Sequence, residues 1–107
     1  MTTLVRQVRQ GDVLLQPIHR LPSSMTPVPS TDGRVVLAYG EVTGHAHTVS
    51  AQHATLYEDD AGNRCLHVTD ATPFVHEEHG AIDLIQETYR VIQQRQYSPS
   101  AIRPVAD

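Results

Sequence analysis

Turn-forming residues interrupt this sequence at short intervals, and their spacing restricts the fold more than any other feature. Gly11-Asp12, Asp32-Gly33 and the segment 59–63 are turn signals. Between them lie short runs rich in β-branched and aromatic residues, such as RVVLAY at 34–39. Such residues fit the pleated surface of a sheet. The pattern predicts an all-β fold, a small single-domain β-barrel or sandwich of about eight short strands.

The expected strands are the runs between these turns. Residues 4–18 are expected to form one or two strands, broken at Gly11-Asp12. The segment 87–97 alternates well enough for a strand, but it also contains good helix formers, so a helix is the alternative there. The remaining strands are expected at 34–40, 45–51, 54–58 and 64–69, with two more inside 72–85.

The chain is expected to form one β-rich domain over residues 1–107, because this length is close to the commonest domain size. Residues 19–33 contain three prolines and little periodicity, which predicts a long loop. Residues 98–107 are expected to form a C-terminal tail. A domain of this size has a small core and unpaired strand edges, so we expect a homo-oligomer, most simply a dimer.

Charge and hydropathy argue against several classes of function. The net charge of −4 disfavours nucleic-acid binding over a broad surface, because each phosphate contact needs a cation. No apolar run reaches the roughly 18 residues that a membrane helix needs. The first residues lack an apolar signal segment and Cys65 is the single cysteine, so we expect a cytoplasmic protein without an intrachain disulfide.

Four of the seven histidines form two close pairs. His45 and His47 are two positions apart, so a strand would place them on one face. His76 and His79 can converge where a strand ends in a turn, for which Gly80 is suited. Two such pairs would offer three or four nitrogen ligands. We therefore predict that these four histidines bind a divalent metal ion, either zinc, iron, manganese or nickel.

The segment TGHAH at 43–47 resembles the start of the first cupin motif, in which a glycine leads into His-x-His. This resemblance implies a minimal cupin-like β-barrel that holds a divalent metal in its mouth. His76 or His79 would then supply the histidine of the second motif. The glutamate that follows the two histidines in cupins has no counterpart here, because Glu58 lies too far along the chain.

A larger part of the chain is similar to short uncharacterised bacterial and phage proteins that share a TGHxH…HxEH…QRxY pattern. The matching segments here are EVTGHAHTV, FVHEEHGAIDL and YRVIQQRQYSP. The resemblance implies that the two histidine pairs act as one unit. It also places Gln94, Arg95 and Tyr97 in the same site or at an interface.

Four residues are candidates for catalysis beside a metal. Glu77 or Glu78 would act as a general base or would orient the far N–H of a histidine. Arg95 would hold an anionic group of the substrate, and Tyr97 would donate a proton. The alternative for Arg95 and Tyr97 is a structural role, because an arginine and a tyrosine on a final strand commonly pack and form salt bridges.

Three functions follow from the histidines. The first is a metal-dependent enzyme acting on a small molecule, with water or substrate at an open metal position. The second is a non-catalytic protein, such as a phage accessory protein, with a closed structural site and a protein partner. The third is a metal-free module whose histidines titrate near neutral pH. The first function requires a metal with an open coordination position, whereas the second has a metal whose positions are all filled by the protein.

Overall fold

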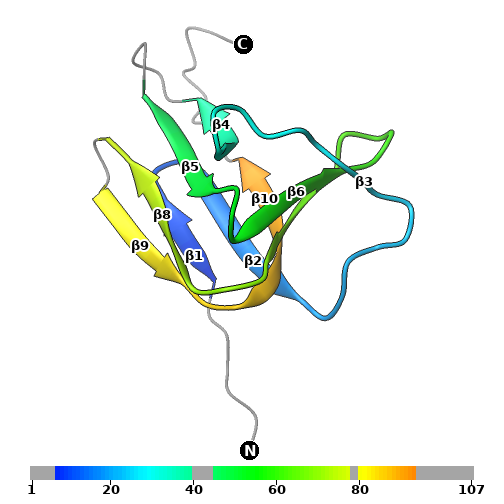
Figure 1. The fold of residues 1–107 in the computed structure, drawn as a ribbon. Helices are drawn as coiled ribbons and strands as arrows, with labels where there is room; N and C mark the ends of the chain where they lie inside the picture. The colour runs from blue at the N-terminus through cyan, green and yellow to red at the C-terminus, as the bar shows by residue number, and fades with distance from the viewer. Residues whose placement is uncertain (1–6, 40–44, 78–79, 94–107) are drawn as a thin grey trace, which may run out of the picture.

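Short antiparallel strands joined by turns and loops make up the computed structural model, which describes residues 7–39, 45–77 and 80–93 (Figure 1). The all-β prediction is confirmed, with more strands than expected. The ten strands among these residues are β1 (Val8–Gln10), β2 (Val13–Ile18), β3 (Thr26–Pro27), β4 (Arg34–Tyr39), β5 (Ala46–Ser50), β6 (Ala54–Glu58), β7 (Arg64–Val68), β8 (Thr72–His76), β9 (Gly80–Leu84) and β10 (Glu87–Gln93).

The strands divide into two sheets. One sheet has six strands in the order β1-β2-β10-β7-β6-β3, and the other has four in the order β4-β5-β8-β9. The two sheets lie against each other, and the described strands do not close into a barrel (Figure 1). Of the two predicted architectures, the structure fits the sandwich.

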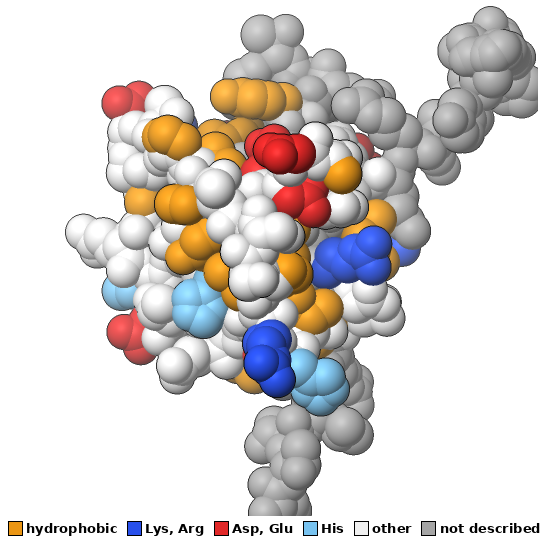
Figure 2. All heavy atoms as spheres, turned by 90° about the vertical axis from the view of Figure 1, so that its right-hand side faces the viewer, with side chains coloured by type: hydrophobic (Ala, Val, Ile, Leu, Met, Phe, Trp, Pro, Cys, Tyr) orange, Lys and Arg blue, Asp and Glu red, His pale blue; other side chains and the backbone are white. Residues whose placement is uncertain are grey.

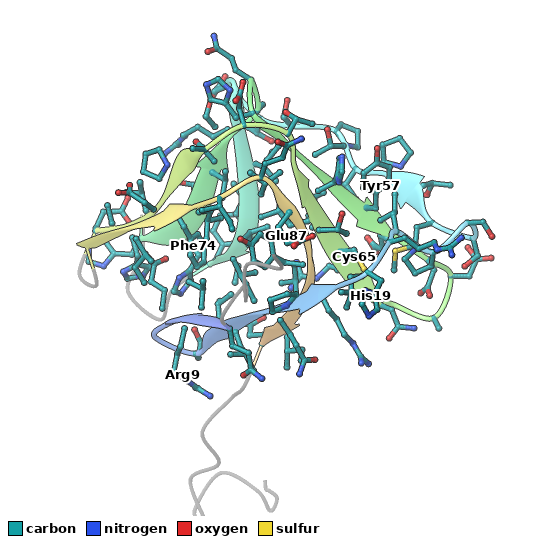
Figure 3. All side chains as sticks on the ribbon, turned by 90° about the horizontal axis from the view of Figure 1, so that it is seen from below. Arg9, His19, Tyr57, Cys65, Phe74 and Glu87 are labelled. Atoms are coloured by element: carbon teal, nitrogen blue, oxygen red, sulfur yellow. The ribbon has the colours of Figure 1, made fainter. Side chains whose placement is uncertain are left out.

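One hydrophobic cluster fills the space between the sheets. Leu15, Leu66 and Tyr89 enter it from the six-stranded sheet, and Val49 and Phe74 enter it from the four-stranded sheet. Figure 3 shows Phe74 between the two layers. Alternation along β8 is strict, with Thr72, Phe74 and His76 buried and the residues between them exposed. Period-two patterning thus decides which side chains reach the core.

The segment 87–97, for which the sequence predicts a strand or, alternatively, a helix, forms a strand in its described part, β10. β10 lies between β2 and β7, and it pairs antiparallel with both. Tyr89 and Val91 share its inner face and are buried, as the strand interpretation predicts. A helix at this place would leave the backbone groups of β2 and β7 without partners. Residues 94–97 of the predicted strand lie outside the described residues.

The predicted loop at 19–33 lies against the six-stranded sheet along β6 and ends in a tight turn before β4. β3 pairs with the end of β6, and the backbone N–H of Val28 donates to the Leu56 carbonyl at 2.7 Å. Thr31 and Arg34 exchange backbone hydrogen bonds of 2.9 and 3.0 Å. The loop therefore covers the outer edge of β6. Figure 2 shows this side of the molecule, where hydrophobic side chains form a band between charged groups.

The turn between β6 and β7 is organised by Asp59. Its Oδ1 accepts hydrogen bonds from the backbone N–H groups of Ala61 and Asn63, at 3.0 and 2.9 Å. Its Oδ2 accepts from the Asn63 side chain at 3.0 Å. These bonds, the one from the Asn63 side chain above all, lower the pKa of Asp59. The predicted turn at 59–63 is confirmed, and a carboxylate holds it closed.

No helix in the part of the chain that the structure describes is long and apolar enough to cross a bilayer. The predicted tail at 98–107 lies outside the described residues.

Candidate metal site

Two histidines from distant parts of the sequence face each other because β5 pairs with β8. The register pairs Thr48 with Val75 and Val49 with Phe74. One residue further along, the same register sets His47 opposite His76 on the inner face. Their ring centroids lie 4.3 Å apart, and the two residues are 1% and 3% exposed.

His45 joins this pair from the position just before β5. Its ring meets that of His76 edge to face, with the ring centroids 5.8 Å apart. His45 is half-buried. Three of the four predicted ligands, His45, His47 and His76, therefore come together at one end of the sandwich. The fourth, His79, lies outside the described residues.

A buried glutamine fixes the orientation of the His47 ring. Gln10, at the end of β1, is 2% exposed. Its Nε2 donates to the backbone carbonyls of Phe74 at 2.8 Å and of Gly80 at 2.9 Å. Its Oε1 consequently faces His47 Nδ1 at 2.9 Å. Because an amide oxygen only accepts hydrogen bonds, His47 Nδ1 carries a hydrogen in this arrangement.

The other nitrogen of His47 faces a carboxylate. Asp12 Oδ1 lies 3.3 Å from His47 Nε2, and the Asp12 side chain is 36% exposed. Its Oδ2 accepts a hydrogen bond from Gln93 Nε2 at 3.1 Å. Burial acts to raise the pKa of Asp12, but the hydrogen bond from Gln93, the Asp12 backbone N–H and the attraction of His47 outweigh it and lower the pKa. Asp12 is therefore ionised at neutral pH.

Glu77 connects the two strands that carry the histidines. Its Oε1 accepts a hydrogen bond of 2.9 Å from the backbone N–H of Ala46. That bond is the main cause that lowers the pKa of Glu77, followed by its own backbone N–H and by His45 and His76. Glu77 is exposed and ionised beside the cluster. The other predicted catalytic residues, Glu78, Arg95 and Tyr97, lie outside the described residues.

The described side chains do not form a finished metal centre. Among residues 7–39, 45–77 and 80–93, no three His, Cys, Asp or Glu side chains are grouped so that they could hold an ion. Zn–N bonds of ~2.0–2.1 Å set the ring centres of two imidazoles on one ion roughly 4.5–5.5 Å apart. The observed centroid distances of 4.3 and 5.8 Å lie on either side of that range. Because the His76 ring enters both distances, binding would require that ring to rotate.

Sequence reasoning missed two residues of this site, Gln10 and Asp12. Gln10 lies two positions after Val8, which packs against the core, so it follows the inward phase of β1. A glutamine at an inward position was a usable signal of a buried polar contact. Asp12 carried no comparable signal, because Gly11-Asp12 is an ordinary turn pair.

The comparisons with known proteins place the chain in a family. Residues 9–94 match the model of a family described as "Domain of unknown function (DUF8820)". No curated protein matches the chain, and no solved structure does. The matched region includes the segments that carry Gln10, Asp12, the histidines and Gln93. Because the match covers most of the sequence, this chain belongs to the DUF8820 family.

Proposed function

We propose that this domain binds one divalent metal ion at the end of the sandwich where His45, His47 and His76 meet. The observation that carries the proposal is the pairing of two almost fully buried imidazoles, His47 and His76, within a core that is otherwise mainly apolar. Burying polar rings costs free energy that hydrogen bonds or a bound ion must offset. Imidazole is also the commonest side-chain ligand of metals.

The position of the cluster favours an ion at the rim of the core. His47 and His76 are buried, whereas Asp12 is partly exposed and Glu77 is exposed. An ion held from the buried side by the three histidines would direct its remaining coordination positions toward the partly exposed side, where a further ligand, water or substrate can bind. Such an open position is what a metal-dependent reaction on a small molecule needs. Ionised Glu77 is the described carboxylate best suited to act there as a general base.

The contact between His47 and Asp12 supports a second candidate function. In a metal-free chain, a proton on His47 Nε2 would form an ion pair with Asp12 across the observed 3.3 Å. The cluster would then be a structural, pH-responsive element, and the domain would act by binding a protein partner.

Elemental mass spectrometry on untagged protein tests the proposal. We expect about one zinc, iron, manganese or nickel ion per chain in the wild type. The ion should be lost in a His45→Ala/His47→Ala double variant and in His76→Ala. The control is His19→Ala, because His19 is exposed and lies in the loop at 19–33.

A wild-type protein without metal, even after refolding with each of the four ions, would contradict the proposal and favour the metal-free candidate. Metal that persists in both histidine variants would place the site elsewhere in the chain.

A further inference from the structure

We infer that Asp12 supplies an oxygen ligand to this metal site and that Gln10 holds His47 in the tautomer that presents Nε2 to the ion. The inference rests on the proposed function and adds two residues to it. The structure connects them in one chain of contacts, from Gln10 to His47, then to Asp12 and Gln93.

The tautomer follows from the two carbonyl groups that bind Gln10. Both amide hydrogens of Gln10 point to backbone oxygens, those of Phe74 and Gly80. A flipped amide would set its oxygen against these two oxygens, with no hydrogen between them. The orientation of Gln10 is therefore decided by the backbone of β8 and β9. His47 must present its Nδ1 hydrogen to Gln10, so Nε2, the nitrogen that faces Asp12, is the one that a metal would bind.

The position of Asp12 fits a ligand on the same ion. Two ligand atoms on a tetrahedral zinc ion, each ~2.0–2.2 Å from it, are about 3.3–3.5 Å apart. His47 Nε2 and Asp12 Oδ1 are 3.3 Å apart, so one ion can contact both atoms with little movement. Gln93 holds the second oxygen of Asp12 from the other side. Metal-binding carboxylates commonly have such a hydrogen-bonding partner.

A carboxylate ligand also changes which ions the site favours. Imidazoles alone suit copper and nickel as well as zinc, whereas an oxygen ligand improves the fit to harder ions. A site of mixed nitrogen and oxygen ligands should therefore retain iron(II) and manganese better than an all-histidine site would.

The first test is nitrogen NMR of the His47 ring. It is made on the wild-type protein, so its result does not depend on whether a variant of the site folds. Long-range proton–nitrogen spectra of metal-free wild type should show a hydrogen on Nδ1. The zinc-loaded protein should keep that hydrogen and show zinc on Nε2. A metal-free ring protonated on Nε2 alone, or zinc bound to Nδ1, would overturn the role of Gln10.

The second test is zinc affinity, measured by competition with a chelator. Gln10→Met keeps a similar shape and removes the hydrogen bonds, and we expect roughly 10- to 100-fold weaker binding. Asp12→Asn still accepts a hydrogen bond from Gln93 and should lose at least as much affinity. The controls are Gln16→Met on β2 and Asp83→Asn on β9.

The outcomes separate this inference from the proposed function. Zinc binding to the wild type with unchanged affinity in Asp12→Asn would remove Asp12 from the site and leave the histidine proposal standing. A wild type that binds no metal would contradict the proposed function and the Asp12 assignment together. In that case, the Nδ1 hydrogen in the metal-free spectrum still decides whether Gln10 sets the tautomer.

Discussion

The β6–β7 hairpin and the β5–β8 pair are both antiparallel, yet they differ in how the chain forms them. β6 and β7 pair in five consecutive positions, and a turn organised by Asp59 joins them directly. β5 and β8 pair in two positions among the described residues, and the entire β6–β7 hairpin lies between them in the sequence.

The inward residues of the two pairs differ as well. The hairpin contributes apolar side chains to the core, including Leu56, Leu66 and Val68. The β5–β8 pair contributes Val49 and Phe74, and then His47 and His76 at its end. Local pairing has a small loop-closure cost, whereas the distant pairing of β5 and β8 depends on the rest of the fold. The comparison predicts that the hairpin contributes most to stability and that the distant pair carries the proposed metal site.

The largest loss of stability should come from a substitution in the β6–β7 hairpin. Leu66→Ala empties a fully buried position and should lower the free energy of unfolding by about 2–5 kcal/mol, measured by urea denaturation. The zinc affinity of the folded fraction should stay at the wild-type value. Leu21→Ala, a half-buried leucine in the loop at 19–33, is the control and should cost less. A parallel loss of zinc affinity in Leu66→Ala would break the comparison.

A smaller loss of stability is expected from a substitution of Gln10, which lies beside the buried histidines. Gln10→Ala deprives the Phe74 and Gly80 carbonyls and His47 Nδ1 of a buried partner, at a cost of about 1–3 kcal/mol. The same denaturation measurement applies, and the exposed Gln7→Ala is the control. Equal stability of the two variants would mean that the buried amide adds nothing to the fold.

The same substitution, glycine to alanine, can be made in both regions, at Gly62 in the hairpin and at Gly80 beside the histidines. Gly62 in the hairpin turn has φ of 88° and Gly80 beside the site has φ of 78°. An added Cβ would meet no atom within 4 Å at either residue, so only backbone strain matters. We expect Gly62→Ala and Gly80→Ala each to cost about 1–2 kcal/mol.

Zinc affinity should distinguish these two variants. Gly80→Ala should weaken zinc binding, because the Gly80 carbonyl accepts one of the hydrogen bonds that orient Gln10. Gly62→Ala should not. Equal zinc affinities would show that the site does not depend on the turn before β9.

The smallest expected change is in the pH dependence of stability, through Asp59 in the hairpin turn. The pKa of Asp59 is lower in the folded chain than its ordinary value, chiefly because of the Asn63 side chain. Its contribution to stability is therefore complete above the unfolded pKa and is lost as the pH falls through the folded pKa. Asp59→Ala should show a shallower loss of stability on acidification than the wild type, measured by denaturation across this range. The control is Asp60→Ala, and an unchanged slope in Asp59→Ala would contradict the assignment.

Much of the fold could be predicted from local signals. Turn residues and alternation located the strands, and the spacing of His45 and His47 predicted that they share a face. β3 escaped prediction because it forms only through its contact with β6, a distant strand. The roles of His79, Glu78, Arg95 and Tyr97 stay predictions, as do the cupin resemblance, the dimer, the protein partner and the cytoplasmic location.

The sequence by itself determined most of the strands and the turns between them, because positive-φ turns and side-chain alternation are properties of neighbouring residues. Only the tertiary structure decided that β5 lies beside β8, and hence that His47 faces His76. It also decided that Gln10 and Asp12 reach the same imidazole from β1 and the turn that follows. The physical reason is that the register of distant strands depends on how both sheets pack, which no short stretch of sequence encodes.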